Sequence, residues 1–393
     1  MSARRVAYVF PGQGSQKVGM GRAWAEASPA ARATLAEADV ALGWPLTRLC
    51  WEGPEEELNL TANTQPALLA VSTAIFRALA AAEPPAGFAA AAWPPLPPPA
   101  AMAGHSLGEY SALVAAGALD FGAALRLVRR RGELMQEAVP VGEGAMAAFL
   151  GLDAVTAAAV AREAEAAVPG EICAVANLNA PGQTVVAGHR RAVERAMALA
   201  RERGARKATL LAVSAPFHSP LMRPARLGMA ELLARTELRD PLVPVVTNVD
   251  AAPVTTAAAA RDALVRQIDS PVRWVESVEW MASQAGVGAF LEIGPGSVLS
   301  GLNRRIAAGA QASPLAEPDQ LRKLLEVWAG AARAEAGEEA AAGPSGPGAV
   351  EAGPGRPDGP GGQARVPGPG GQGGAEAPPA PAPAAPQAGR GEG

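Results

Sequence analysis

Apolar residues along the chain gather in short runs separated by longer stretches of helical periodicity. Residues 6–10 form a wholly apolar run that ends at Pro-Gly, a pattern typical of a strand buried on both faces of a parallel sheet. Helical patterns follow over 22–42 and 64–82. A second apolar run at 100–103 leads into an apolar helical stretch that reaches about residue 119. Strands and helices that alternate in this way indicate an α/β protein.

The middle of the chain has a different rhythm, which we interpret as a unit inserted over residues 143–213. The order of its expected elements is β-α-β-β-α-β, the order of a ferredoxin-like unit. They are a strand at 145–152, a helix at 153–168, strands at 172–178 and 184–188, a helix at 190–203 and a strand at 208–213. The chain then returns to the larger domain through a strand at 243–247, a helix near 258–268 and a strand at 289–293 followed by a last helix.

Two segments differ in composition from the rest of the 393 residues. Residues 83–99 are rich in Pro and Ala, and we expect a surface loop there. Residues 335–393 contain 17 Gly and 12 Pro, with Val350 and Val366 as the larger aliphatic side chains. Such a segment buries too little apolar area to offset the entropy of ordering it, so we predict a disordered tail.

Charge and cysteine usage narrow the class of protein. The tail holds seven acidic and three basic residues, which accounts for the net charge of −4 and leaves the remainder balanced at 31 of each. That balance argues against a nucleic-acid footprint over the whole body of the protein, and a local basic patch for an acidic partner remains open. Cys50 and Cys173 lie far apart without metal or redox spacing, so we expect buried thiols. The apolar run at 6–10 is too short for a signal peptide or a membrane span, and we predict a cytoplasmic protein.

A candidate nucleophile lies where the second apolar run ends. Gly104-His-Ser106-Leu-Gly108 fits G-x-S-x-G, in which glycines allow a sharp turn from strand to helix that exposes the serine oxygen. A strand-like run precedes the motif and an apolar helix follows it, as that turn requires. The Leu107 N–H would then point at an oxyanion formed beside Ser106. The competing interpretation is a structural serine at a helix start.

A serine nucleophile needs a base, and the chain has three histidines. His105 is adjacent to Ser106 and is expected to face away from it. His189 opens a helix of the inserted unit, where a capping or solvated role is expected. His218 remains, in a Pro-rich loop directly after a strand, where catalytic side chains are commonly held.

The Gly-rich segment Pro11-Gly-Gln-Gly-Ser-Gln-Lys17 follows the first strand. It lacks the Gly-Lys-Ser/Thr ending of a phosphate-binding loop and the third Gly of a dinucleotide fingerprint. A flexible loop at this place could instead bring the Gln13 amide to a substrate oxygen as a second oxyanion donor.

Several longer motifs then carry a resemblance to a known family. They are Phe10-Pro-Gly-Gln-Gly-Ser-Gln16, Gly104-His-Ser-Leu-Gly-Glu-Tyr-Ser-Ala-Leu113, Arg131-Gly-Glu-Leu-Met-Gln136, Phe217-His218 and Glu292-Ile-Gly-Pro-Gly296. In this order they resemble malonyl-CoA:acyl-carrier-protein transacylases over roughly residues 5–310. The resemblance implies that Ser106 is the acylated nucleophile and His218 its general base and acid. It also implies oxyanion N–H groups from Gln13 and Leu107, and Arg131 as the ligand of the malonyl carboxylate.

Further roles follow from the same resemblance. A backbone carbonyl at Gln267 would orient the histidine, with no acidic third member. Phe217 resembles the pattern that favours malonyl over branched acyl groups. Arg206 and Lys207 match basic positions that meet the acidic carrier protein, and a solvated pair is the alternative. For Arg126, Arg129 and Arg130, next to Arg131, we prefer a basic helix face.

Together these observations predict an α/β-hydrolase-like large subdomain, residues 1–142 and 214–315, with the ferredoxin-like unit inserted. Malonyl-CoA would acylate Ser106, and the phosphopantetheine thiol of acyl carrier protein would then accept the malonyl group in a ping-pong reaction. We expect no metal or redox cofactor, no nucleic-acid or membrane partner, and a monomer.

Two other functions remain open from the residues. A serine hydrolase or thioesterase uses the same turn, with Asp153 or another acid as the third member of its triad. An inert module that docks a carrier protein is the second, and Ser106, His218 and Arg131 argue against it.

Overall fold

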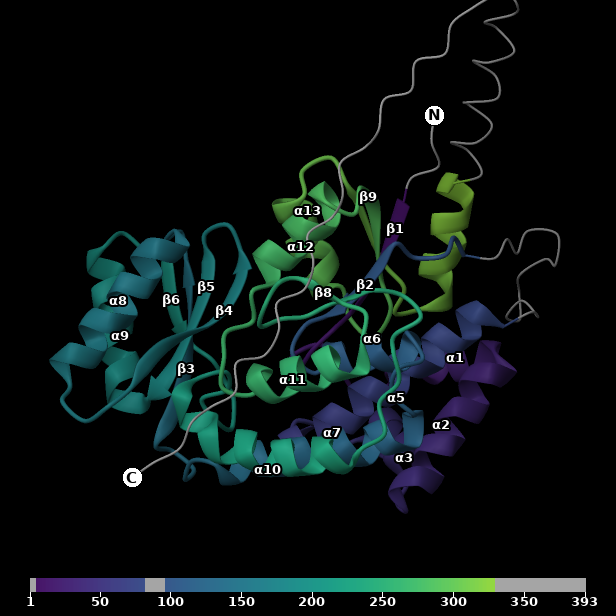
Figure 1. The fold of residues 1–393 in the computed structure, drawn as a ribbon, viewed down its shortest axis with the longest axis horizontal. Coiled ribbons are helices and arrows are strands. Elements are labelled where there is room, and N and C mark those ends of the chain that lie inside the picture. The colour runs from purple at the N-terminus through teal and green to yellow at the C-terminus, as the bar shows by residue number, and fades with distance from the viewer. Residues whose placement is uncertain (1–4, 82–95, 329–393) are drawn as a thin grey trace, which may run out of the picture. The chain divides into compact units, whose positions relative to one another are not determined.

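A six-stranded sheet lies at the centre of the computed structural model, which describes residues 5–81 and 96–328 (Figure 1). These residues fall within the first of two units of the chain, Met1–Gly337; the second, Glu338–Gly393, lies outside them. The predicted tail and most of the Pro-rich stretch at 83–99 also lie outside the described residues.

The strand order of this sheet is β10-β9-β1-β2-β7-β8, and β8 alone among them pairs antiparallel. Alternate side chains of β1 enter two different cores: Val6 and Tyr8 pack on one face, and Ala7 and Val9 on the other. The predicted parallel strand buried on both faces is therefore confirmed. The strands are β1 (Arg5–Phe10), β2 (Ala101–Gly104), β7 (Val245–Val246), β8 (Pro253–Val254), β9 (Val287–Glu292) and β10 (Gln311–Pro314).

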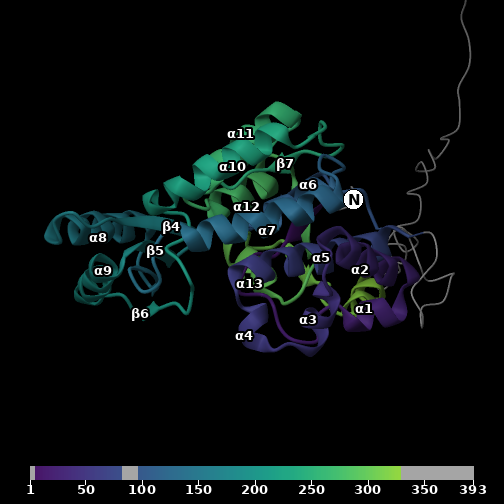
Figure 2. The ribbon, with the colours of Figure 1, turned by 90° about the horizontal axis from the view of Figure 1, so that it is seen from below.

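Helices cover both faces of this sheet. The larger core joins one face to helices from the first half of the chain and to α10, and α7 lies beside α10 along it (Figure 2). The smaller core joins the other face to α12 and α13. The helices are α1 (Arg22–Ala27), α2 (Pro29–Leu42), α3 (Leu46–Glu52), α4 (Glu55–Leu58), α5 (Thr61–Ala80), α6 (Gly108–Ala115), α7 (Phe121–Glu137), α10 (Arg223–Arg235), α11 (Ala257–Gln267), α12 (Trp274–Ser283) and α13 (Val298–Ile306).

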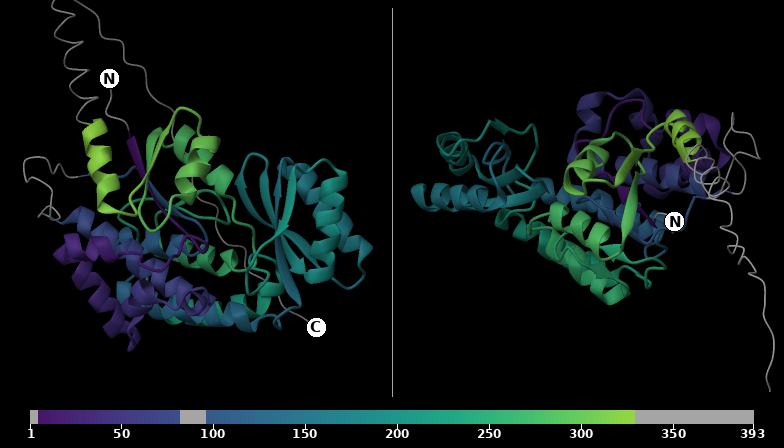
Figure 3. Two further views of the ribbon diagram at one scale, coloured as in Figure 1. Left: turned by 180° about the vertical axis from the view of Figure 1, so that it is seen from behind. Right: turned by 90° about the horizontal axis from the view of Figure 1, so that it is seen from above.

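A separate four-stranded antiparallel sheet has the order β4-β5-β3-β6. Helices α8 and α9 lie on the same side of its strands and share one apolar core with them (Figure 3). The observed order β-α-β-β-α-β agrees with the order expected for the middle of the chain. The elements are β3 (Gly144–Leu150), α8 (Ala154–Ala167), β4 (Cys173–Ala180), β5 (Gln183–His189), α9 (Arg190–Glu202) and β6 (Lys207–Leu210).

The two sheets are linked through the segment that precedes α12. Val272 donates its N–H to Ala176 O (2.9 Å) and accepts from Leu178 N (2.9 Å), so β4 pairs with this segment over a short stretch. The pairing places the end of β4 near the turn that follows β2.

The structure differs from the expected elements in several places. The single helix expected at 22–42 is two helices, because Ser28 is extended and caps α2 through Ala31 N, with Pro29 in the first turn. The strand expected at 208–213 ends at Leu210. Helices α3, α4, α10 and α12, the helical residues 318–328, and strands β8 and β10 were not expected.

Candidate active site

The turn from β2 to α6 holds Ser106 in a sharp bend. A Cβ on Gly104 would lie 1.8 Å from Gly108 C, and a Cβ on Gly108 would lie 2.1 Å from Phe10 O. The two glycines of the motif are therefore required by close backbone contacts. Ser106 has a φ of 51°, in the left-handed region that non-glycine residues rarely adopt.

His218 lies in contact with the candidate nucleophile. Its Nε2 is 2.7 Å from Ser106 Oγ, and its Nδ1 is 3.0 Å from the backbone oxygen of Gln267. A carbonyl oxygen can only accept, so Nδ1 carries the proton and Nε2 is left to accept from the serine hydroxyl. His218 also has a positive φ, 57°, so both residues of this pair are held in strained backbone conformations.

Burial keeps this histidine uncharged. Loss of solvent, and then the charge of Arg131, lower the pKa of His218 to about 3. The imidazole is therefore neutral at physiological pH and is available to accept a proton.

Arg131 extends from α7 into the same site and is 1% exposed. Its Nη1 donates to Gln65 Oε1 (2.9 Å), and its Nη2 donates to Gln267 Oε1 (2.9 Å) and to Ser106 Oγ (3.2 Å). The guanidinium also lies over the ring of Tyr110, 5.5 Å from its centroid. Its hydrogen-bond partners among the described residues are thus all uncharged, so a buried positive charge lies beside Ser106 without a bonded carboxylate.

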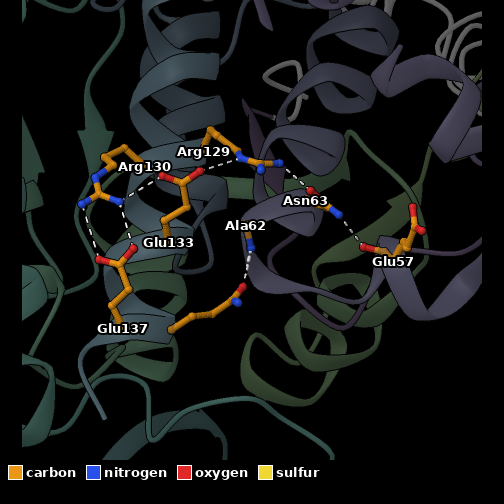
Figure 4. A network of polar contacts seen from close by, with 8 residues as sticks. Glu57, Ala62, Asn63, Arg129, Arg130, Glu133 and Glu137 are labelled. Atoms are coloured by element: carbon orange, nitrogen blue, oxygen red, sulfur yellow. Dashed lines mark hydrogen bonds and ion pairs between the residues drawn. The ribbon is translucent and has the colours of Figure 1, made fainter. Parts of the chain in front are cut away.

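Arg129 and Arg130, next to Arg131 on α7, form ion pairs with carboxylates of the same helix (Figure 4). Arg129 pairs with Glu133, and Arg130 pairs with Glu133 and Glu137, at N–O distances of 2.9–3.1 Å. Arg126 is exposed and donates to Ala41 O. These three form the polar face of the helix, as expected, while Arg131 faces inward.

Two backbone N–H groups near Ser106 donate to no other described residue. They belong to Leu107, the N-cap residue of α6, and to Gln13. The side-chain amide of Gln13 is engaged with Thr61 Oγ1 (3.1 Å), so its backbone N–H is the donor left available. A Cβ on Gly12 would lie 2.4 Å from His105 O, which places this loop against the serine turn.

Four other residues were singled out from the sequence, and only one of them, Phe217, lies next to His218. Phe217 is buried next to His218. Arg206 and Lys207 are exposed at the start of β6. Asp153 is exposed and caps α8 through Thr156 N (2.8 Å), so it does not contact His218.

The other two histidines are engaged elsewhere. His105 Nε2 is 2.9 Å from Asn179 Oδ1 on β4, and its ring packs against Trp274. His189 Nδ1 accepts from Ile172 N (2.9 Å).

Sequence reasoning missed three buried polar residues of the site: Gln65, Glu109 and Asn248. Asn248 accepts from Ser106 N (2.6 Å) and donates to Gly104 O (2.7 Å), so one amide holds the serine turn from both sides. Glu109 accepts from Asn248 N (2.8 Å) and from Gln267 Nε2 (2.9 Å). Glu109 is the one charged residue of α6 and follows the serine motif directly, which was the signal that could have identified it.

Within residues 5–81 and 96–328, no cluster of three or more His, Cys, Asp or Glu side chains could hold a metal ion. None of the helices described there is long and apolar enough to span a membrane.

Comparison with known proteins identifies the family. The sequence model of the acyl transferase domain family matches residues 7–317. The chain therefore belongs to the acyl transferase domain family. Malonyl CoA-acyl carrier protein transacylase of Escherichia coli (strain K12) is 50% identical over 321 residues, which cover 82% of this chain and 99% of that protein. The Bacillus subtilis (strain 168) protein of the same name is 44% identical, with 82% and 97% covered. Within the domain family, the chain belongs to the malonyl CoA-acyl carrier protein transacylases.

Solved structures agree with this assignment. The acyl carrier protein S-malonyltransferase of Vibrio cholerae O1 is 46% identical, with a TM-score of 0.75 and coverage of 81% of this chain and 99% of that one. A malonyl-transacylase in complex with its holo type II PKS acyl-carrier protein is 48% identical, with a TM-score of 0.75 and coverage of 82% and 99%. The mixed α/β fold, with one sheet containing parallel strands and a separate antiparallel sheet, matches these structures.

Proposed function

We propose that this chain transfers the malonyl group of malonyl-CoA to the phosphopantetheine thiol of acyl carrier protein. The observation that carries the proposal is the buried guanidinium of Arg131, bonded to neutral groups and 3.2 Å from the oxygen of Ser106. A site built this way favours an acyl group with a free carboxylate, and the curated relatives are named for that reaction.

Acylation begins when Ser106 Oγ attacks the thioester carbonyl carbon while its proton passes to His218 Nε2. The carbonyl oxygen becomes an oxyanion, which accepts hydrogen bonds from the N–H groups of Leu107 and Gln13. The C–S bond then breaks, and the proton moves from Nε2 to the departing sulfur, so that CoA leaves as a thiol. The product of this half-reaction is a malonyl ester on Ser106.

Transfer repeats these steps with a new thiol. His218 accepts the proton of the phosphopantetheine thiol, and the sulfur attacks the ester carbonyl of the malonyl-serine. The ester C–O bond breaks, and the proton returns to Ser106 Oγ. The backbone oxygen of Gln267 holds the imidazole in the required orientation throughout both half-reactions.

Arg131 selects the acyl group in this scheme. Its Nη2 contact with Ser106 Oγ is long, and the malonyl carboxylate replaces it with two parallel bonds from Nη1 and Nη2. Gln65 and Gln267 keep the guanidinium in place as this exchange occurs. Phe217 narrows the acyl site beside His218 and disfavours branched acyl groups.

The carrier protein is the proposed macromolecular partner, as in the related complex of a malonyl-transacylase with its acyl-carrier protein. Arg206 and Lys207 are exposed at β6 without an ion pair to another described residue. Two free cations suit an acidic partner.

We assign the six-stranded sheet to an α/β-hydrolase-like subdomain, residues 1–142 and 214–315, and the antiparallel sheet to a ferredoxin-like subdomain, residues 143–213. The strand order β4-β5-β3-β6 supports the second assignment. We further propose a cytoplasmic monomer that needs no metal or redox cofactor; Cys50 and Cys173, both buried and free, suit a reducing compartment.

A hydrolase of the triad type is less well supported. His218 Nδ1 is bonded to the backbone of Gln267 rather than to a carboxylate, and Asp153 caps a helix of the other sheet.

Intact-mass measurement tests the proposal. Incubation with malonyl-CoA should add one malonyl group to the wild-type protein and none to Ser106→Ala. Addition of holo acyl carrier protein should remove the label and yield malonyl carrier protein. Label that persists in the Ser106→Ala variant, or that appears mainly as free malonate, would overturn the proposal.

A further inference from the structure

The side-chain amide of Gln267 joins the parts of the site. Its Oε1 accepts from Arg131 Nη2 (2.9 Å), and its Nε2 donates to Glu109 Oε2 (2.9 Å) and to Ser106 O (3.0 Å). Gln267, Glu109 and Arg131 are each no more than 1% exposed. Water therefore does not compete for these bonds, and their orientation is set by the protein alone.

An amide of this kind has two orientations of nearly equal shape, related by exchange of its oxygen and nitrogen. A guanidinium can only donate, so Arg131 requires the oxygen to face it. Glu109 Oε2 already accepts from Asn248 N, so it acts as an acceptor and requires the amide nitrogen of Gln267 on the opposite side. Without Glu109, the Nε2 group keeps the Ser106 carbonyl at 3.0 Å and a long contact of 3.4 Å to Asn248 Oδ1. The reversed amide would direct an NH₂ group at the guanidinium.

Burial of the Glu109 carboxyl is unfavourable for the stability of the fold. Its Oε1 is buried without a hydrogen-bond partner among the described residues. Burial also raises the pKa of its carboxyl to about 7, so the fold bears a free-energy cost for keeping this group in place. The two bonds made by Oε2, to Gln267 Nε2 and to Asn248 N, offset part of that cost, and the charge of Arg131 offsets a further part.

We infer that Glu109 is a positioning residue for carboxylate recognition: it fixes the Gln267 amide with its oxygen toward Arg131 and so aims the guanidinium at the acyl group. The inference rests on the proposed function. It assigns Glu109 a part in the choice of acyl group, separate from the chemistry of Ser106 and His218, because His218 is held by the backbone of Gln267 and not by its amide.

The test compares kcat/KM for formation of the acyl-enzyme from malonyl-CoA and from acetyl-CoA. Glu109→Met keeps the volume of the side chain and removes both acceptors, and its malonyl-to-acetyl ratio should fall by about tenfold or more. Glu109→Gln can present its amide oxygen to both donors, so its ratio should stay within about threefold of wild type. The malonyl-to-acetyl ratio separates the two cases, because damage to the serine turn lowers kcat/KM for both substrates by the same factor.

A matched control exists at Glu292, which is also fully buried and accepts from Leu299 N, Ser300 N and Ser300 Oγ. Glu292→Met should lower the melting temperature and leave the malonyl-to-acetyl ratio unchanged.

An unchanged ratio in folded Glu109→Met overturns the inference, and so does a fall of the ratio in Glu292→Met that equals the fall in Glu109→Met. If Glu109→Met does not fold, Glu109→Gln decides, because a large loss of ratio there contradicts the orientation argument. A wild-type protein that takes no malonyl label refutes the proposed function instead.

Discussion

Arg131 carries a full charge where its bonded partners are two amide oxygens and a hydroxyl. Burial lowers the pKa of this arginine, because holding a cation away from water costs free energy. A carboxylate that enters the site removes that cost, whereas a neutral acyl group leaves it in place. With the role proposed for Arg131, selectivity for malonyl is a property of the free enzyme as much as of the bound complex.

Replacing this arginine should weaken the preference for malonyl over acetyl. Loss of one partner of a buried charge pair costs about 2–5 kcal/mol, so Arg131→Ala should lower malonyl transfer by roughly 30-fold or more. Acetyl-CoA has no carboxylate, and its use should stay level or rise. The measurement is the ratio of kcat/KM for the two substrates. Arg130→Ala is the matched control: Arg130 is partly exposed in its ion pairs, so both substrates should change little. An unchanged ratio in Arg131→Ala would remove the main support for malonyl recognition.

The pH dependence of acylation should also differ from that of an ordinary histidine base. Because the pKa of His218 is lowered to about 3, the imidazole stays neutral as pH falls from 8 to 5. The kcat/KM for acylation reports the free enzyme, so the titration of His218 should add no inflection near 6.5, the usual pKa of histidine. Rapid quenching and intact mass at four pH values would measure this.

Two variants sharpen that experiment. Arg131→Ala removes the second cause of the lowered pKa of His218, so any inflection should move upward in pH, as measured with acetyl-CoA. Glu109, with a pKa of about 7, is a second group that titrates in this range, and Glu109→Gln removes its contribution. An inflection near 6.5 that persists in Glu109→Gln would refute the neutral, buried base.

Residue by residue, the sequence led to Ser106 through its glycines and to His218 by elimination among three histidines, and the structure brings the two to 2.7 Å. Glu109 and Asn248 could not be paired in advance, because 139 positions separate them and either residue type is common in surface loops. Their contact depends on β7 lying next to β2, which only the folded sheet establishes.

At the scale of elements, the spacing of apolar residues predicted a strand or helix correctly where the element is long enough to show a regular spacing. The run at 6–10 is an example, since both faces of β1 are buried. Short strands at the sheet edge, such as β8 and β10, carry too few residues to show a period. The broken helix at Ser28 was missed because the apolar spacing continues across the cap.

Close contacts between helices also escaped the sequence. Gly132, directly after Arg131, lies so near the start of α5 that a Cβ there would be 2.7 Å from Ala62 Cα. This contact allows α7 to approach α5, which carries Gln65, and the two helices together hold the guanidinium. A glycine within a helical pattern indicates close packing of this kind only once its neighbour is known.

At the scale of the whole molecule, the core of the first unit extends to the end of the described residues. The helical residues 318–328 contribute Leu321 and Leu324, which are 0% and 6% exposed, to the large core. Beyond residue 335 the composition changes, with 17 Gly and 12 Pro in 59 residues and almost no large apolar side chain. The apolar positions that stabilise the acyltransferase therefore end before the tail starts.

Two truncations should separate these parts of the chain. A protein that ends at residue 334 keeps every described apolar contact, so its melting temperature and malonyl transfer rate should equal those of the full chain. A protein that ends at residue 316 loses Leu321 and Leu324, each contributing about 1.5–3 kcal/mol by burial, and should melt several degrees lower. Thermal unfolding and transfer to holo acyl carrier protein measure both. A large loss in the protein that ends at 334 would mean that the tail packs against the enzyme or helps to dock the carrier, contrary to its composition.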